Sequence, residues 1–283
     1  MNAAAPVEID LTVPGGRLHA ELSGPADGPL VLCLPGLTAN LRGFDLMVPR
    51  LAAAGLRVAA LDLRGRGRSD LSPPGTYGWP AHANDVLAAA TALGRERFSV
   101  AGWSMGAFVA LQAAALAPGR VERLVLIDAC SPPSAAVLTL IRLAVDRLGA
   151  VYPSAGEYMA RMRALPTIER WGDFWERYFH YELVPANGGV RARTSRDAVL
   201  EDLAYGDAHD PRDLWSALTM PVLLLRAARP LVPGGPFLVT ASDVDELRRR
   251  VAGVQVVEIE ANHYGIAASP AAAEAAARFL GPA

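Results

Sequence analysis

The sequence predicts an α/β fold: a mostly parallel eight-stranded sheet with helices on both faces and an inserted helical segment. Short, continuously apolar runs alternate with helical patterns, which is typical of strands buried on both faces. The alternation stops after residue 128 and resumes at residue 222. A serine flanked by glycines also stands between one such run and an Ala-rich helical pattern. We therefore expect a core of residues 1–130 and 216–283, and a helical lid of residues 131–215.

The first half of the chain opens with two alternating segments and continues with buried strands. The alternating segments, residues 7–11 and 17–22, are joined through Pro14-Gly15-Gly16 and predict an antiparallel hairpin. The expected buried strands are residues 30–34, 57–61, 98–101 and 123–127. The expected helices between them are residues 44–54, 83–93 and 105–117.

The second half contains the expected lid and the end of the core. Residues 131–215 show helical patterns interrupted by prolines, and we predict no strand among them. Strands at residues 222–226 and 254–259, with helices at 244–251 and 270–280, complete the predicted sheet. We expect the lid to cover the ends of the core strands.

Composition narrows the function classes. Of the 283 residues, 52% are hydrophobic and 20% are charged, and the net charge is −2, so we expect neither a nucleic-acid nor a membrane partner. Cys33 and Cys130 are too few for a disulfide framework or a metal cluster, and no cofactor or metal is expected. A cytoplasmic protein with a small-molecule substrate is the default expectation, and the sequence leaves a homodimer possible.

Residues 99–108 organise the rest of the chain. Ser104 lies between Gly102 and Gly106 in a G-x-S-x-G pattern that follows a strand and precedes a helix. A nucleophilic serine on such a sharp turn needs small neighbours two residues away on either side. The pattern alone also fits an ordinary Gly-rich strand-to-helix turn, so the remaining motifs must support it.

Three further motifs follow other predicted strands in order. They are Pro35-Gly36-Leu37-Thr38, the segment Asp62-x-Arg64-Gly65-x-Gly67-x-Ser69, and Asn262-His263-Tyr264. Together with the serine motif, they resemble the α/β-hydrolase fold superfamily, specifically its lidded esterase, lactonase and C–C hydrolase branch. The resemblance covers nearly the whole chain.

The resemblance implies a catalytic serine and its helpers. Ser104 would be the nucleophile and His263 its general base. The N–H groups of Leu37 and Met105 would form the oxyanion hole. The family's usual His-Gly pair is replaced here by Pro35-Gly36, which removes a side chain that often braces this loop.

The acid of the triad has more than one candidate position in this sequence. Most of the superfamily carries it after the seventh strand, where this chain has no carboxylate until Asp243 and Asp245. A minority carries it directly after the sixth strand, where this chain has Asp128. We favour Asp128 and retain two alternatives: Asp243 or Asp245, which also fit helix-start residues, and a site without an acid.

Aromatic side chains at helical spacing mark one face of the expected lid. We expect Trp171, Trp175 and Tyr178 of this face, together with Trp103 beside the serine, to contact substrate. Packing within the lid is the competing interpretation of the aromatic face. An apolar substrate of moderate size would suit such a roof.

The functional prediction is a serine hydrolase that cleaves an ester or lactone through an acyl-enzyme, with a Ser104–His263–Asp128 triad. Two alternatives remain: a C–C bond hydrolase on a vinylogous diketone, and a non-hydrolytic cyclase or small-molecule binder on the same fold. Pro35 and the missing acid after strand seven favour the non-hydrolytic alternative more than usual.

Overall fold

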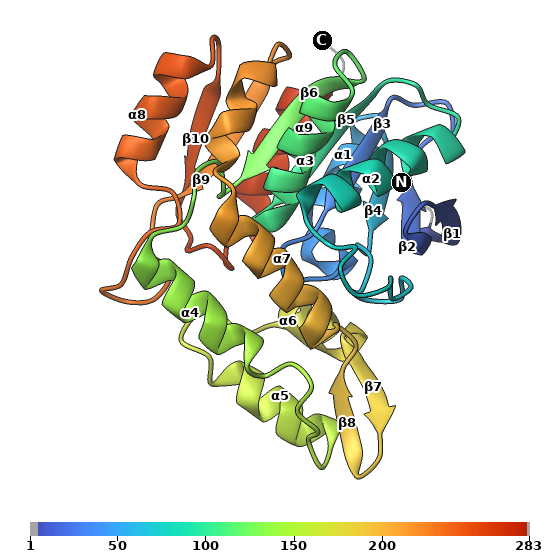
Figure 1. The fold of residues 1–283 in the computed structure, drawn as a ribbon, viewed down its shortest axis with the longest axis vertical. Coiled ribbons are helices and arrows are strands. Elements are labelled where there is room, and N and C mark those ends of the chain that lie inside the picture. Colours follow the sequence, from blue (N-terminus) through green and yellow to red (C-terminus); the bar gives the residue numbers. More distant parts are fainter. Residues whose placement is uncertain (1–4, 282–283) are drawn as a thin grey trace.

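The computed structural model describes residues 5–281, so residues 1–4 and 282–283 of the expected core lie outside the described part of the chain. An eight-stranded sheet of order β1-β2-β4-β3-β5-β6-β9-β10 forms the centre (Figure 1). Its strands are β1 (Val7–Val13), β2 (Gly16–Ser23), β3 (Leu30–Leu34), β4 (Arg57–Leu61), β5 (Phe98–Trp103), β6 (Val121–Ile127), β9 (Val222–Ala227) and β10 (Gln255–Ile259). The predicted α/β fold class is confirmed.

Strand direction determines where the loops gather. β2 pairs antiparallel with β1 and β4, whereas β4, β3, β5, β6, β9 and β10 run parallel to one another. The loops after the parallel strands therefore emerge at one edge of the sheet. Ligand sites of open α/β sheets lie at this edge, outside the carboxyl ends of the strands.

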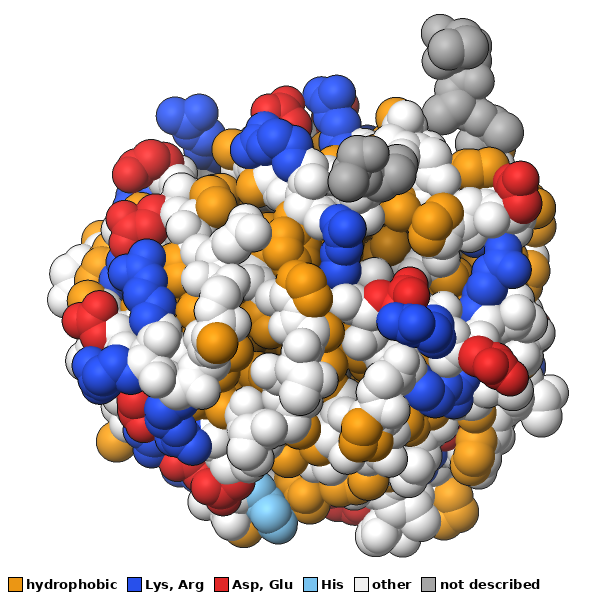
Figure 2. All heavy atoms as spheres, turned by 90° about the horizontal axis from the view of Figure 1, so that it is seen from above, with side chains coloured by type: hydrophobic (Ala, Val, Ile, Leu, Met, Phe, Trp, Pro, Cys, Tyr) orange, Lys and Arg blue, Asp and Glu red, His pale blue; other side chains and the backbone are white. Residues whose placement is uncertain are grey.

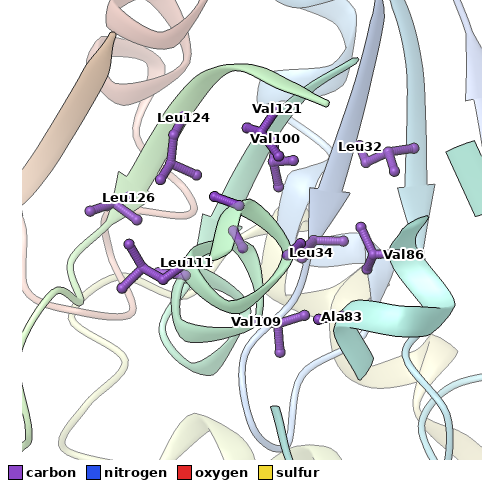
Figure 3. Close-up of a cluster of buried hydrophobic side chains, with 14 of the residues drawn as sticks. Leu32, Leu34, Ala83, Val86, Val100, Val109, Leu111, Val121, Leu124 and Leu126 are labelled. Atoms are coloured by element: carbon purple, nitrogen blue, oxygen red, sulfur yellow. The ribbon is translucent and has the colours of Figure 1, made fainter. Parts of the chain in front are cut away.

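Helices cover both faces of the sheet. The core helices are α1 (Met47–Ala53), α2 (Trp79–Ala92), α3 (Met105–Leu116), α8 (Ala241–Arg250) and α9 (Pro270–Leu280), with a short 3-10 helix η1 (Leu41–Phe44). Successive residues of β3 face opposite sides, as expected of a strand. Leu32 and Leu34 pack with α2 and α3 (Figure 3), while Val31 and Cys33 join the cluster formed with α1 and α9.

Residues 131–215, which we call the insertion, separate β6 from β9. The insertion contains α4 (Ala135–Val145), α5 (Ala155–Arg163), α6 (Asp173–Tyr181), β7 (Leu183–Ala186), β8 (Gly189–Ala192), α7 (Arg196–Ala208) and the first part of a 3-10 helix, η2 (Pro211–Ala217). Figure 1 shows α4, α5 and the β7–β8 pair projecting away from the main sheet.

The expectation that the insertion contains no strand is wrong. β7 and β8 form a separate two-stranded antiparallel sheet, and neither joins the main sheet. Asn187-Gly188 connects them, a dipeptide suited to a tight hairpin turn, and Gly188 has a φ of 88°. The Asn-Gly signal was present in the sequence, but the strands beside it are only four residues long.

The surface opposite the insertion carries both signs of charge. Figure 2 shows Arg and acidic side chains interspersed over this face, with hydrophobic side chains between them. Within the described residues, no helix combines the length and the apolar character needed to cross a membrane.

Candidate active site

Ser104 stands at the junction of β5 and α3 in a backbone conformation that non-glycine residues rarely adopt. Its φ is 57° and its ψ is −123°. A Cβ on Gly102 would lie 2.3 Å from the Gly106 carbonyl oxygen, and one on Gly106 would lie 2.1 Å from the Leu34 carbonyl oxygen. Backbone contacts this close admit only glycine at both positions, so the sequence motif reflects the steric demands of the turn.

His263 and Asp128 form a buried pair next to this turn. Asp128 directly follows β6, and His263 lies in the loop after β10. His263 Nδ1 lies 2.9 Å from Asp128 Oδ2, and the two residues are only 7% and 1% exposed. The carboxylate is also fixed from its other side, because Asp128 Oδ1 accepts the N–H of Ala227 at 2.9 Å. The pair orients the imidazole so that Nε2 remains free for a second partner.

The two other candidate acids lie elsewhere. Asp243 sits in the first turn of α8, where its carboxylate accepts the N–H of Thr240 in a capping box. Asp245 is an exposed residue of the same helix. Asp243 occupies an ordinary helix-start position, and neither residue is the hydrogen-bond partner of His263 Nδ1.

Trp103 links the serine turn to the histidine loop. Its Nε1–H donates to the carbonyl oxygen of His263 at 3.2 Å, and the two rings are 5.7 Å apart. Within residues 5–281, no hydrogen bond joins Ser104 Oγ to His263 Nε2. Such contacts are often long in the absence of a ligand and shorten when substrate binds.

The loop after β3 provides N–H donors beside the serine. Gly36 lies against Ser104, since a Cβ there would be 3.1 Å from the serine Cβ. Within the described chain, the N–H groups of Leu37 and Met105 donate to no backbone carbonyl outside the regular elements. Met105 is the first residue of α3, so its N–H has no intrahelical partner either. Both N–H groups therefore lack a backbone acceptor, and Leu37 also lines the cavity described next.

A cavity of about 830 Å³ opens beside Ser104 and His263 and extends under the insertion. Of the residues expected to contact substrate, Trp103 and Tyr178 line it. Trp171 and Trp175 lie outside its wall. Trp171 stacks on Phe179 and Trp175 packs edge-to-face on Tyr178, so both support the lining from behind. For these two tryptophans, packing within the insertion is the structural role.

The sequence reasoning missed a buried polar group at the cavity wall. Arg147, which lines the cavity, donates to the Tyr158 hydroxyl at 2.9 Å and to the Glu182 carboxylate. Burial opposes the charge of Arg147, but Glu182 outweighs it and holds the pKa of Arg147 above its usual value. Burial also raises the pKa of Tyr158, and Glu182 adds to the shift. No local pattern could reveal this group, because its members come from three separate segments of the insertion.

One group of described side chains has the spacing of metal ligands. Glu8, His19 and Glu21 place one ligand atom each within 4.8 Å of one another on the β1–β2 hairpin. However, Arg68 pairs with Glu8 and Arg42 pairs with Glu21. The arginines neutralise both carboxylates, so the group is better explained as an ion-pair cluster.

Two solved hydrolase structures are similar in fold to this chain over nearly its whole length. A solved E-2-(acetamidomethylene)succinate hydrolase aligns over 97% of this chain and 99% of its own, with a TM-score of 0.85 and 24% identity. An α/β hydrolase from Novosphingobium aromaticivorans aligns over 98% of both chains, with a TM-score of 0.78 and 27% identity.

Three curated relatives are similar in sequence over part of their length. A serine hydrolase-like protein of Danio rerio is 40% identical over 122 residues, which are 43% of this chain and 37% of that protein. A putative carbamate hydrolase of Variovorax paradoxus is 39% identical over 118 residues, or 42% and 44% of the two chains. An N-formylmaleamate deformylase of Pseudomonas putida is 38% identical over 114 residues, or 40% and 38%. The matched part thus spans less than half of each relative.

The family model of the alpha/beta hydrolase fold matches residues 29–226, which is more than half of the chain. This match includes the serine turn, Asp128 and the insertion. Together with the sheet order and the serine turn, it shows that the chain belongs to the α/β hydrolase fold family.

Proposed function

We propose that this protein is a serine hydrolase that cleaves an ester or lactone of a moderately sized apolar small molecule through an acyl-enzyme. The observation that carries the proposal is the buried His263–Asp128 pair beside a serine on a strained turn. In serine hydrolases, a carboxylate on Nδ1 holds the tautomer in which Nε2 can accept a proton.

The mechanism follows from these positions. His263 Nε2 takes the proton of Ser104 Oγ as the oxygen attacks the substrate carbonyl carbon, and Asp128 stabilises the resulting imidazolium. The N–H groups of Leu37 and Met105 donate to the oxyanion. The tetrahedral intermediate collapses, the protonated His263 gives its proton to the leaving alkoxide, and an ester of Ser104 remains. Water activated by His263 then hydrolyses this acyl-enzyme by the same steps.

We infer that the insertion acts as a lid over this chemistry. Its α4, α5 and α6 contribute cavity-lining residues, so a bound substrate would contact both the core and the insertion. Leu140, Ile141 and Met162 make this roof largely apolar. An apolar roof excludes water from the reacting carbonyl and favours an apolar acyl or alcohol group.

Hydrolysis of a C–N bond is the second candidate. The names of two relatives, a putative carbamate hydrolase and an N-formylmaleamate deformylase, favour it. The same serine, histidine and oxyanion donors would serve, with an amine rather than an alcohol as the leaving group. The C–C hydrolase alternative has no comparable support here.

The test combines covalent labelling with a substrate panel. A fluorophosphonate probe should label the purified protein at Ser104, as located by peptide mass spectrometry, and Ser104→Ala should abolish labelling without changing the far-UV circular dichroism spectrum. A panel of p-nitrophenyl esters, lactones, carbamates and N-formyl amides then ranks the leaving groups. Labelling that persists in Ser104→Ala, or a wild-type protein that neither labels nor turns over any panel member, would overturn the proposal.

A further inference from the structure

A fully buried arginine lies behind the loop that carries Leu37. Arg66 is 1% exposed, and its guanidinium donates in three directions. Its Nε–H donates to the Leu37 carbonyl oxygen at 3.0 Å, and Nη1 donates to the Arg64 carbonyl oxygen at 3.0 Å. Its Nη2 donates to the carboxylate of Asp202, which belongs to α7 of the insertion. One side chain thus connects the loop after β3, the loop after β4 and the insertion.

Asp202 is itself held by the core. Its carboxylate accepts the Gly78 N–H at 2.7 Å and lies 3.0 Å from His82 Nε2 at the start of α2. Asp202 is 2% exposed and His82 is fully buried. Burial opposes the negative charge of Asp202, but Arg66 and His82 outweigh it and hold its pKa well below the usual value. Asp202 therefore remains ionised, and paired with Arg66, above the ordinary aspartate pKa of about 3.9.

Two hydrogen bonds fix the peptide planes around Leu37. The carbonyl of Gly36 shares a peptide plane with the Leu37 N–H, and it accepts the Ala39 N–H at 3.1 Å. The carbonyl of Leu37 belongs to the next plane, which Arg66 holds. With both planes fixed, the direction of the Leu37 N–H is fixed as well. Pro35 cannot contribute a polar side chain or an N–H to this support.

We propose that Arg66 is a positioning residue for the oxyanion hole, and that Asp202 makes this positioning depend on the insertion. The proposal rests on the hydrolase function proposed above. Arg66 does not touch substrate, since neither it nor Asp202 lines the cavity. It acts through Leu37, whose N–H must point at the oxyanion rather than at the ground-state carbonyl oxygen. Because α7 carries Asp202, the placement of this helix on the core and the alignment of the donor are linked.

The chain supplies a matched control in the adjacent pair Arg64–Asp85. Arg64 is also buried, and its Nε donates to Asp85 at 2.7 Å. Its other acceptors are the carbonyls of Thr76 and Ala81, neither of which belongs to the loop after β3. Arg64→Lys and Arg66→Lys are therefore the same substitution in the same segment, and only the second removes a contact to Leu37.

The experiment measures kcat per active site in both variants. Titration with a fluorophosphonate to its end point counts the functional serines, which corrects for any unfolded fraction. We expect Arg66→Lys to lower kcat per titrated site by about 10- to 100-fold, somewhat less than loss of a whole oxyanion donor, with KM changed less than about 3-fold. Affinity for an aryl boronic acid, which places a negative oxygen in the same hole, should fall in parallel. Arg64→Lys should retain kcat per site even where its melting temperature falls.

The outcomes separate this proposal from the proposed function. Equal kcat per site in the two variants would show that Arg66 is structural only and would overturn the inference. The hydrolase proposal would still stand in that case, provided that the fluorophosphonate labels the wild-type protein. Absence of wild-type labelling would remove the basis of both. If Arg66→Lys does not fold, the double variant Arg66→Gln/Asp202→Asn removes both buried charges together. The same loss of kcat per site is expected from it, because glutamine is too short to replace all three donors.

Discussion

The Asp128 carboxylate lies 2.9 Å from His263 Nδ1 across a separation of 135 residues. The carboxylate cannot turn freely, because its second oxygen accepts the N–H of Ala227 in the neighbouring strand β9. Asp128 also has a φ of 48°. Among the described non-glycine residues, only Asp128 and Ser104 have a positive φ. Such conformations cost free energy and persist where the surrounding structure enforces them. The two described non-glycine residues with a positive φ therefore both lie in the proposed triad.

Asp128→Asn tests the role of this carboxylate. An asparagine keeps the shape but can present an N–H to Nδ1, which favours the wrong imidazole tautomer and removes the charge that stabilises imidazolium. In the best-studied triad, this change lowers kcat by about 10⁴-fold. We expect a loss of the same order here, measured as kcat on the best substrate of the panel, with the protein still folded.

Asp243→Asn is the matched control for that measurement. Its carboxylate caps α8 through Thr240, so the substitution should cost about 1 kcal/mol of stability or less and leave kcat nearly unchanged. The assignment of Asp128 would be contradicted if the two variants lost activity equally, or if Asp243→Asn lost more.

Gly106→Ala tests the steric explanation of the serine motif. The added Cβ would lie 2.1 Å from the Leu34 carbonyl oxygen, and 2.7 Å from that of Pro35, so the backbone must move. We expect destabilisation of about 3 kcal/mol or more, measured by urea unfolding. Gly156→Ala in α5 meets only a side-chain oxygen at 3.7 Å and should be neutral or slightly stabilising. Similar unfolding midpoints for the two variants would contradict the explanation.

The strands of the main sheet could be predicted from the sequence because the patterns that mark a strand are local. Each buried strand is a short apolar run, and each run is followed by a turn or helix-start pattern, so the strand segments and the position of Ser104 could be predicted. Asp128 could be proposed because a minority of the superfamily that the chain resembles carries its acid directly after the sixth strand, where this chain has an aspartate.

The rest of the site depends on contacts that no local pattern encodes. The aromatic spacing of α6 predicted one shared face, but it could not tell Tyr178, which reaches the cavity, from Trp175, which packs behind it. The Arg66–Asp202 pair could not be predicted from the sequence either, because 136 residues separate its members and neither belongs to a motif for ion pairing. The rotation of each helix and the partner of each buried charge are set by tertiary packing.

Substitution at Tyr178 tests the assignment of the cavity wall. Tyr178→Leu enlarges the cavity that Ser104 also lines, so KM should change by about 3-fold or more, with the largest effect on esters with bulky acyl groups. Trp171→Leu, at a position outside the wall, should leave KM within about 2-fold and affect mainly the melting temperature. If Trp171→Leu shifts the substrate preference more than Tyr178→Leu, the cavity is lined differently when substrate is bound.

The buried His82 predicts a dependence of stability on pH. Burial lowers the pKa of His82, and the positive charges of Arg66 and Arg64 add to the shift, while Asp202 opposes it. The unfolded chain has the ordinary histidine pKa of about 6.5, so below that pH the unfolded state binds more protons than the folded state at this position. The contribution of neutral His82 to stability is therefore complete above about pH 6.5 and is lost as the pH falls towards the folded-state pKa.

His82→Gln isolates this contribution, because glutamine can still donate to Asp202 but does not titrate. Between about pH 6.5 and 5, the free energy of unfolding of the wild type should fall more steeply than that of the variant, by up to about 1.4 kcal/mol per pH unit. Urea unfolding of both proteins at a series of pH values measures the difference. Asp202 does not confound this window, since its lowered pKa removes stability only below the ordinary aspartate pKa of about 3.9. Parallel curves for the two proteins would show that His82 binds its proton equally well in the folded and unfolded states.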